Sequence, residues 1–171
     1  MDWKLIFILI AIFIYAIYNI LMLCFFGIPE SLSMTFYLLK NKKPWTRFFF
    51  PIMMISLSLL LLPSWLEIST GHNLQFLTFL AAAGIMFTGV APEFQRSDLE
   101  NIVHTGSAIV SASVALIWVV CCTNAWNIVC LWFLFFSLIA FITKTIINSY
   151  TYWLEQITVV STFNAILLYF I

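Results

Sequence analysis

Six apolar stretches, each about 20 residues long, make up most of the chain and constrain its fold more than any motif does. Four of them contain no Asp, Glu, Lys or Arg, and each of the other two contains one such residue near an end, Lys144 or Glu155. A helix needs about 20 apolar residues to cross roughly 30 Å of hydrocarbon. The predicted membrane spans are 5–26, 48–65, 74–91, 102–122, 127–147 and 154–171.

The composition supports this interpretation. Of the 171 residues, 64% are hydrophobic and only 8% are charged, which is too little polar surface to cover a water-soluble globule. The formal net charge is zero, whereas a nucleic-acid-binding protein needs a basic face, so we expect no nucleic-acid partner. The sequence therefore predicts an all-α polytopic integral membrane bundle of about six transmembrane helices, forming a single domain over residues 1–171.

Lys and Arg are distributed unevenly between the connectors. A basic cluster lies between the first two spans, Arg96 lies between the third and fourth, and Lys144 lies near the end of the fifth, whereas only Lys4 is on the opposite side. Cytoplasmic loops carry an excess of Lys and Arg. This distribution predicts that both termini are outside.

The connector after the first span has features of a short helix at the membrane surface. Pro29 suits a helix start, and Leu32, Phe36 and Leu39 recur at helical spacing. We expect this apolar face to enter the headgroup region while a lipid-facing basic cluster meets anionic lipid. That cluster consists of Lys40, Lys42, Lys43 and Arg47. The alternatives are an ordinary basic loop that sets topology and an element that binds lipid or a partner.

Small residues gather in the third and fourth spans. The segment "AAAGIMFTG" contains Gly84 and Gly89, and Ala108, Ser111, Ala112 and Ala115 lie on one side of the fourth span. Small residues allow helix backbones to approach closely, so these spans are predicted to form the compact centre of the bundle. The same face also suits contact with another membrane protein or a second copy of this chain, and its serines suit a cavity.

Two long segments resemble a known group of proteins. They are "FGIPESLSMTFYLL" after the first span and "FLTFLAAAGIMFTGVAPEFQRSDLENIVHTGSA" across the third and fourth. Together they resemble uncharacterised small six-span membrane proteins of gut Bacteroidales and their phages, a resemblance that implies a bacterial inner (plasma) membrane and no particular activity. More remotely, "IPESLS", "EFQ" and "HTGSA" resemble motifs of the DRAM/Frag-like superfamily of six-span proteins. That second resemblance implies a cytoplasmic N-terminus, opposite to the orientation that the Lys and Arg residues predict.

Polar and ionisable residues near one end of the spans form a candidate polar cluster. Its members are Glu93, Asp98, Glu100, His104, Lys144 and Glu155. An ionisable group at membrane depth is a functional candidate, and Glu100 is one helical turn from His104. Lys144 is predicted either to pair with Glu155 or to extend to the headgroups. Alternatively, His104 is simply hydrogen-bonded at the water interface.

The side chains that metal and cofactor chemistry needs are few. His72 and His104 are expected on opposite sides of the membrane, and no third histidine exists, so we predict no metal site and no cofactor. Cys122 and Cys130 flank one outer turn, where they are either bridged or free thiols.

The predicted function is a non-enzymatic structural role or an interaction with membrane lipids or a partner. The alternatives are a small-molecule or lipid-handling protein, which requires a polar cavity between the spans, and an intramembrane enzyme. An enzyme would require Asp98, Glu100 and His104 to share one pocket, and we assign no catalytic residue.

Overall fold

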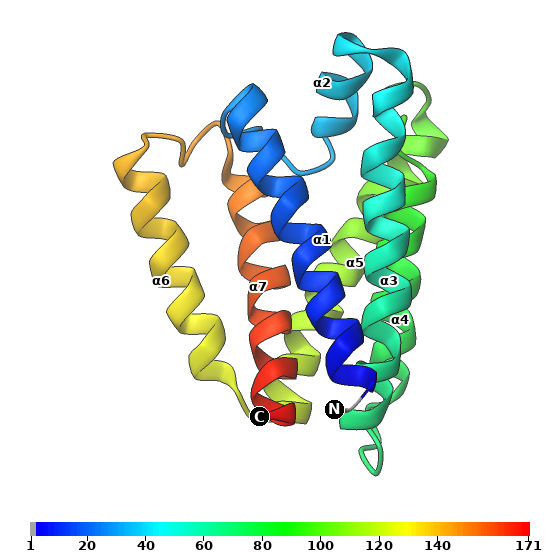
Figure 1. Ribbon diagram of the computed structural model, residues 1–171, viewed down its shortest axis with the longest axis vertical. Helices are drawn as coiled ribbons and strands as arrows, with labels where there is room; N and C mark the ends of the chain where they lie inside the picture. Colours follow the sequence, from blue (N-terminus) through cyan, green and yellow to red (C-terminus); the bar gives the residue numbers. More distant parts are fainter. Residues whose placement is uncertain (1–2) are drawn as a thin grey trace.

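A computed structural model describes residues 3–171 and forms an all-α bundle (Figure 1). The helices are α1 (Trp3–Phe26), α2 (Thr35–Lys42), the 3-10 helix η1 (Pro44–Phe48), α3 (Phe49–Ile68), α4 (Phe76–Val90), α5 (Asp98–Thr123), α6 (Trp126–Ile142) and α7 (Tyr150–Phe170). No β-strand occurs in the described part of the chain. The predicted all-α fold class, with a short helix after the first span, is confirmed.

Three helical segments are long and apolar enough to cross a membrane: α1, the continuous segment Pro44–Ile68 and α5. α4 and α6 are apolar but shorter, with 15 and 17 residues. At 1.5 Å per residue they are roughly 22 and 26 Å long, close to the thickness of a hydrocarbon core. This length and composition are those of a membrane protein.

The helix ends depart from the predicted spans for local reasons. α3 continues through Pro63 to Ile68 instead of ending at residue 65. α5 begins at Asp98, earlier than residue 102, because the Ser97 hydroxyl accepts a hydrogen bond from the backbone of Glu100 and caps the helix. α6 ends at Ile142 rather than residue 147, and Lys144 two residues on has a left-handed φ of 56°.

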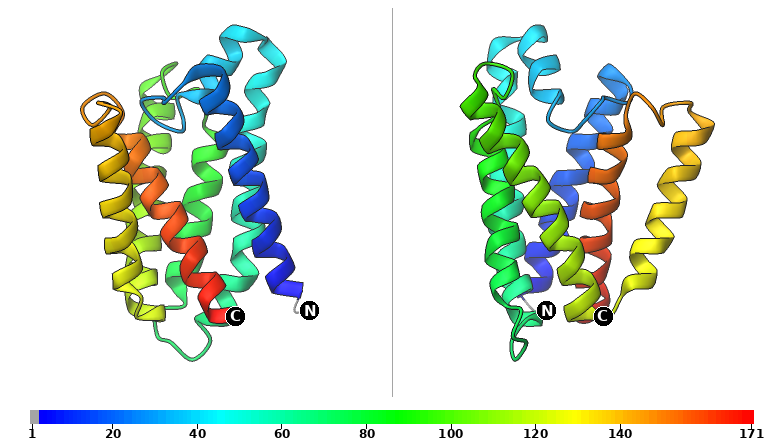
Figure 2. Two further views of the ribbon diagram at one scale, coloured as in Figure 1. Left: turned by 60° about the vertical axis from the view of Figure 1, so that its left-hand side comes forward. Right: turned by 180° about the vertical axis from the view of Figure 1, so that it is seen from behind.

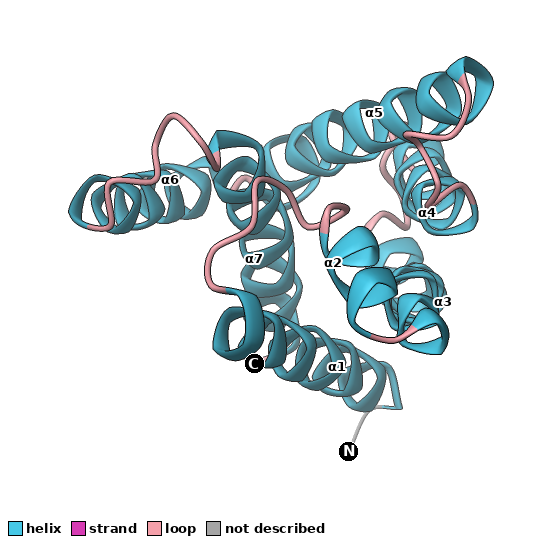
Figure 3. Ribbon diagram, turned by 90° about the horizontal axis from the view of Figure 1, so that it is seen from above, coloured by secondary structure: helices cyan, strands magenta, loops and turns pink. Residues whose placement is uncertain are grey.

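Helix packing places the polar connectors at the same end of the bundle (Figures 1 and 2). α4 packs against both α3 and α5, α1 packs against α3 and α7, and α7 packs against α5 and α6. α6 is the outermost helix when the bundle is seen from above (Figure 3). Segments 27–48, 91–97 and 143–149 lie at one end of the bundle, and both termini lie at the other.

The predicted close packing of the small residues is confirmed at the α4–α5 contact. A Cβ atom added to Gly84 would be 2.7 Å from the Cβ of Ser111 and 2.9 Å from the carbonyl oxygen of Ser107. The hydroxyls of Thr88 and Ser107 are hydrogen-bonded at 3.0 Å. Ser111 and Ala115 are buried, so this small-residue face lies inside the chain.

Buried polar side chains join helices that are distant in sequence. The Asn19 side-chain oxygen in α1 accepts hydrogen bonds from Tyr152 Oη at 3.2 Å and Gln156 Nε2 at 2.8 Å, both in α7. The Trp118 indole donates to Ser69 Oγ at 2.6 Å. Asn19 therefore links α1 to α7 through its side-chain oxygen.

The orientation predicted for the apolar side of the first connector is wrong. Leu32, Phe36 and Leu39 are only 4%, 2% and 5% exposed, because they pack into the bundle and not against the membrane surface. Gly27 ends α1 with a φ of 73°, a left-handed conformation that glycine adopts without strain. The backbone of Glu30 then accepts a hydrogen bond from Tyr152 N at 3.1 Å, which fixes the connector against the start of α7.

Candidate functional site

The polar residues of interest surround an inner loop, which we define as residues 27–34. Within this loop Leu32 and Ser33 are buried, so the loop enters the polar end of the bundle. The Leu32 N–H donates to Glu155 Oε2 at 2.6 Å. Because backbone N–H groups at a helix start lack partners within the helix, the bond from Tyr152 N to Glu30 O also satisfies the first turn of α7.

His104 is held between the inner loop and the end of α4. Its Nδ1 is 2.9 Å from the Ala91 carbonyl oxygen, and its Nε2 is 2.8 Å from Ser33 Oγ. The Phe94 ring stacks on the imidazole with 4.5 Å between centroids. A carbonyl can only accept, so Nδ1 carries the proton, and in the neutral ring Nε2 accepts from the Ser33 hydroxyl. His104 therefore connects three segments as a buried hydrogen-bonding group.

The structure does not bring Glu100 and His104 together. Ser97 Oγ lies 3.2 Å from Glu100 Oε2 and also accepts from the Glu100 backbone N–H at 3.3 Å. The carboxylate therefore turns back toward the helix start, where the helix dipole favours negative charge. His104 instead contacts Ser33, Ala91 and Phe94.

Glu93 joins the two charged connectors in a surface ion cluster. Its carboxylate lies 3.2 Å from Lys40, 3.4 Å from Arg47 and 3.5 Å from Arg96. A hydrogen bond from Lys40, together with the surrounding positive charges, lowers the pKa of Glu93, although partial desolvation opposes this shift. Two residues of the predicted lipid-facing cluster, Lys40 and Arg47, thus contact a carboxylate of the protein.

The remaining members of the predicted clusters are separated. Lys42 lies 4.1 Å from the centroid of the Phe25 ring. Lys43, Asp98 and Lys144 are exposed. Within residues 3–171, Lys144 makes no ion pair with Glu155, because α6 ends early and Lys144 lies in the turn that follows. The candidate polar cluster is thus not one site, since Glu93 and Glu155 have different neighbours.

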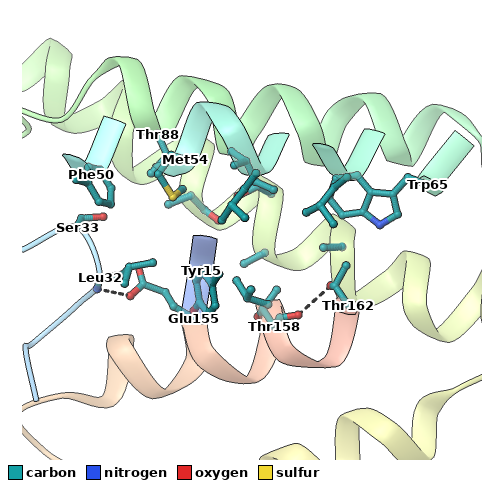
Figure 4. Close-up of a pocket in the computed structure, with 18 residues that line it drawn as sticks. Tyr15, Leu32, Ser33, Phe50, Met54, Trp65, Thr88, Glu155, Thr158 and Thr162 are labelled. Atoms are coloured by element: carbon teal, nitrogen blue, oxygen red, sulfur yellow. Dashed lines mark hydrogen bonds between the residues drawn. The ribbon is translucent and has the colours of Figure 1, made fainter. Parts of the chain in front are cut away.

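Glu155 lies in the wall of a partly open cavity of about 80 Å³ between α1, α3, α4, α5 and α7, with the inner loop at one end (Figure 4). Apolar side chains from α3, including Met54, Leu57 and Leu61, form much of the wall. This volume would hold roughly five to eight waters or one slim apolar chain, and it is too small for a folded or multi-ring ligand. Glu155 and Ser33 lie toward one end of this cavity, and Trp65 lies toward the other.

The hydroxyls of the cavity wall already donate their protons within the protein. Thr158 donates to Leu154 O at 2.9 Å, and Thr162 donates to Thr158 O at 2.8 Å. Ser111 donates to Ala108 O at 3.0 Å. The Ser33 hydroxyl likewise donates to Nε2 of His104. These hydroxyls therefore offer only lone pairs to anything in the cavity.

Two further polar atoms in the wall, Tyr15 Oη and Trp65 Nε1, are buried and have no hydrogen-bond partner within the described residues. Both residues line the cavity, but these two atoms are inaccessible, so neither offers its proton to the interior. The polar groups accessible to the cavity are thus acceptors.

The sequence predicted Glu155 as a member of the polar cluster and as one alternative partner of Lys144, but not as part of a cavity wall. A signal was nevertheless present, because no Lys, Arg or His lies three or four residues from Glu155 in either direction. An acidic residue in an apolar helix without such a neighbour indicates a functional group or a partner elsewhere. Ser33 carried no such signal, since its position in the cavity wall depends on how the inner loop folds back.

The described residues contain no group of three or more His, Cys, Asp or Glu side chains that could hold a metal ion. Cys122 and Cys130, like Cys24 and Cys121, are free thiols. The alternative of a bridge between Cys122 and Cys130 is not formed.

Comparison with known proteins finds no family model, no curated protein and no solved structure that matches this chain. The fold and the cavity define the class as an all-α membrane bundle with a partly open cavity between its helices.

Proposed function

We propose that this protein is a non-enzymatic membrane protein that binds a slim amphipathic small molecule inside its helical bundle. The observation that carries the proposal is the cavity itself, which combines an apolar wall with one carboxylate and a few hydroxyls. Ligand sites in proteins are mostly apolar and contain a small number of polar groups that orient the ligand, and bundles build such sites between facing helices.

The arrangement of polar groups favours binding over catalysis. An intramembrane enzyme of the kind considered from the sequence needs Asp98, Glu100 and His104 in one pocket. Asp98 is exposed, and the carboxylate of Glu100 accepts a hydrogen bond from the Ser97 hydroxyl. Both nitrogens of His104 already have partners, Ala91 O and Ser33 Oγ.

Binding is tested with purified full-length protein in nonionic detergent and with two radiolabelled probes, hexanol and hexylamine. The wild type is expected to bind at least one of them at a saturable site. Ala112→Phe places an aromatic ring in the cavity wall and is expected to abolish this binding. Ser113→Phe is the matched control, because residue 113 is the next position on α5 and is exposed. Equal binding by these two variants, or no saturable binding by the wild type, would refute the proposal.

A second candidate function is a structural or partner-binding role, and the exposed apolar surface of α6 supports it. This helix exposes large apolar side chains such as Leu131, Leu134 and Phe141, with exposed fractions of 61%, 67% and 70%. Lipid or another membrane protein would cover them. Substituting Leu134 and Phe141 with Ala is expected to weaken the association of a tagged copy with such a partner in crosslinked membranes, and unchanged crosslinking would exclude this role.

The proposed membrane arrangement is six spans in a bacterial inner membrane with both termini outside. It is supported by the position of the three charged connectors at one end of the bundle, where positive charge favours the cytoplasm. Single cysteines at Lys42, Ser97 and Asn124 in a cysteine-free variant test it in intact cells. Labelling at Asn124 alone is expected, whereas labelling at Lys42 and Ser97 would invert the topology.

A further inference from the structure

Glu155 is the one acidic residue in the cavity wall, and its charge is only partly compensated. Oε2 accepts from Leu32 N–H at 2.6 Å, while no described residue donates a hydrogen bond to Oε1. None of the four ion pairs in residues 3–171 includes Glu155. An ionised carboxylate without a cation is costly in an apolar interior. A cation bound next to Glu155 would therefore compensate a charge that the protein itself leaves without a counter-ion.

The hydroxyl groups of the cavity wall, like the Glu155 carboxylate, can only accept hydrogen bonds from a ligand. The protons of Ser111, Thr158 and Thr162 are used in bonds to backbone carbonyls. A ligand group placed among these side chains must therefore donate hydrogen bonds. An alkyl ammonium group has three N–H donors, no acceptor and a positive charge, and its apolar chain suits the Met54, Leu57 and Leu61 side of the wall.

We propose that the cavity is selective for a slim amphipathic cation, an alkylammonium, whose charged head lies against Glu155 and whose apolar chain extends along α3. This selectivity rests on the proposed binding function and specifies its ligand class. A primary alcohol of the same chain length lacks the charge and has one donor, so it is the matched neutral probe.

The test compares hexylamine with hexanol, using full-length protein in nonionic detergent without anionic lipid. A charge-assisted hydrogen bond corresponds to a difference in affinity of about 10- to 150-fold, so the wild type is expected to bind hexylamine more tightly than hexanol by a factor in that range. Glu155→Gln is expected to remove this preference, so that the affinities for hexylamine and hexanol become equal. Glu67→Gln, the same substitution in the exposed partner of Lys4 at the other end of the bundle, is expected to preserve it.

A second variant that keeps the negative charge makes the test informative even if Glu155→Gln fails to fold. Glu155→Asp retains a carboxylate and is expected to retain a preference for hexylamine over hexanol. Equal affinity of the wild type for the two probes, or a preference that survives in Glu155→Gln, would overturn the cation selectivity while leaving the binding function intact. Absence of saturable binding for both probes would overturn both proposals and indicate a cavity that only holds water.

Discussion

Gly84 provides the sharpest test of the helix packing. A Cβ atom at this position would be 2.7 Å from Ser111 Cβ and 2.9 Å from Ser107 O, both on α5. The second contact is with backbone, so Gly84→Ala requires α4 and α5 to move apart. Overpacking costs about 1–3 kcal/mol, whereas replacing glycine by alanine inside a helix stabilises by roughly 0.5–1 kcal/mol. The middle of these ranges gives a net loss of about 1 kcal/mol in the free energy of unfolding.

Gly106→Ala is the matched control because no atom lies within 4 Å of the Cβ it would add on α5. It receives the same helix stabilisation without a clash, so stability is expected to rise by roughly 0.5–1 kcal/mol. The two variants should thus differ by about 2 kcal/mol, or about 4–8 °C in apparent Tm. Thermal unfolding followed by far-UV circular dichroism in one detergent measures the difference. A Gly84→Ala protein as stable as Gly106→Ala would refute the close contact.

Three further predictions concern polar groups. Neutral His104 should carry its proton on Nδ1, which ¹⁵N NMR of the imidazole reports, and a protonated Nε2 would contradict the bond to Ala91. Because the folded-state pKa of Glu93 lies below its ordinary 4.5, the stability from its ion cluster should be present above pH 4.5 and be lost as the pH falls through the lowered value. Glu93→Gln should therefore flatten thermal stability across this range, and an unchanged pH profile would argue against the cluster. Asn19→Leu deprives two buried donors of their acceptor and should lower the free energy of unfolding by about 1 kcal/mol or more, whereas thermal denaturation at the wild-type temperature would contradict the network.

The apolar helices could be predicted from the sequence because each contains a long apolar stretch, but their exact ends depend on local capping and turns. The predicted start at residue 102 missed the first turn of α5, since Asp98 and Glu100 were counted as loop charges when Ser97 in fact caps a helix there. The end of α6 was predicted too late because Ile146 and Ile147 extended the apolar window past Thr143 and Lys144, where the backbone turns.

The candidate site was harder to predict, because side-chain partners depend on tertiary contacts. Leu32, Phe36 and Leu39 have the spacing of an amphipathic surface helix, and that spacing does not distinguish a lipid surface from a protein interior. Lys40 and Arg47 were expected to face anionic lipid, but Glu93 lies within ion-pair distance of both. The positions of basic residues in the sequence do not show which acidic side chain of another connector will pair with them in the folded protein.

The inner loop gives the cavity its chemical asymmetry. The Leu32 N–H of this loop donates a hydrogen bond to the Glu155 carboxylate, and its Ser33 hydroxyl donates one to His104 on α5. The same loop accepts the Tyr152 N–H through Glu30 O. Hydrogen bonds to α5 and α7 thus fix the inner-loop end of the cavity, whereas the α3 side chains that face the cavity, such as Leu57 and Leu61, are apolar. Hydrogen bonds are directional and apolar contacts are not, so the end at Glu155 can orient a polar head while the wall along α3 tolerates variation in the apolar chain.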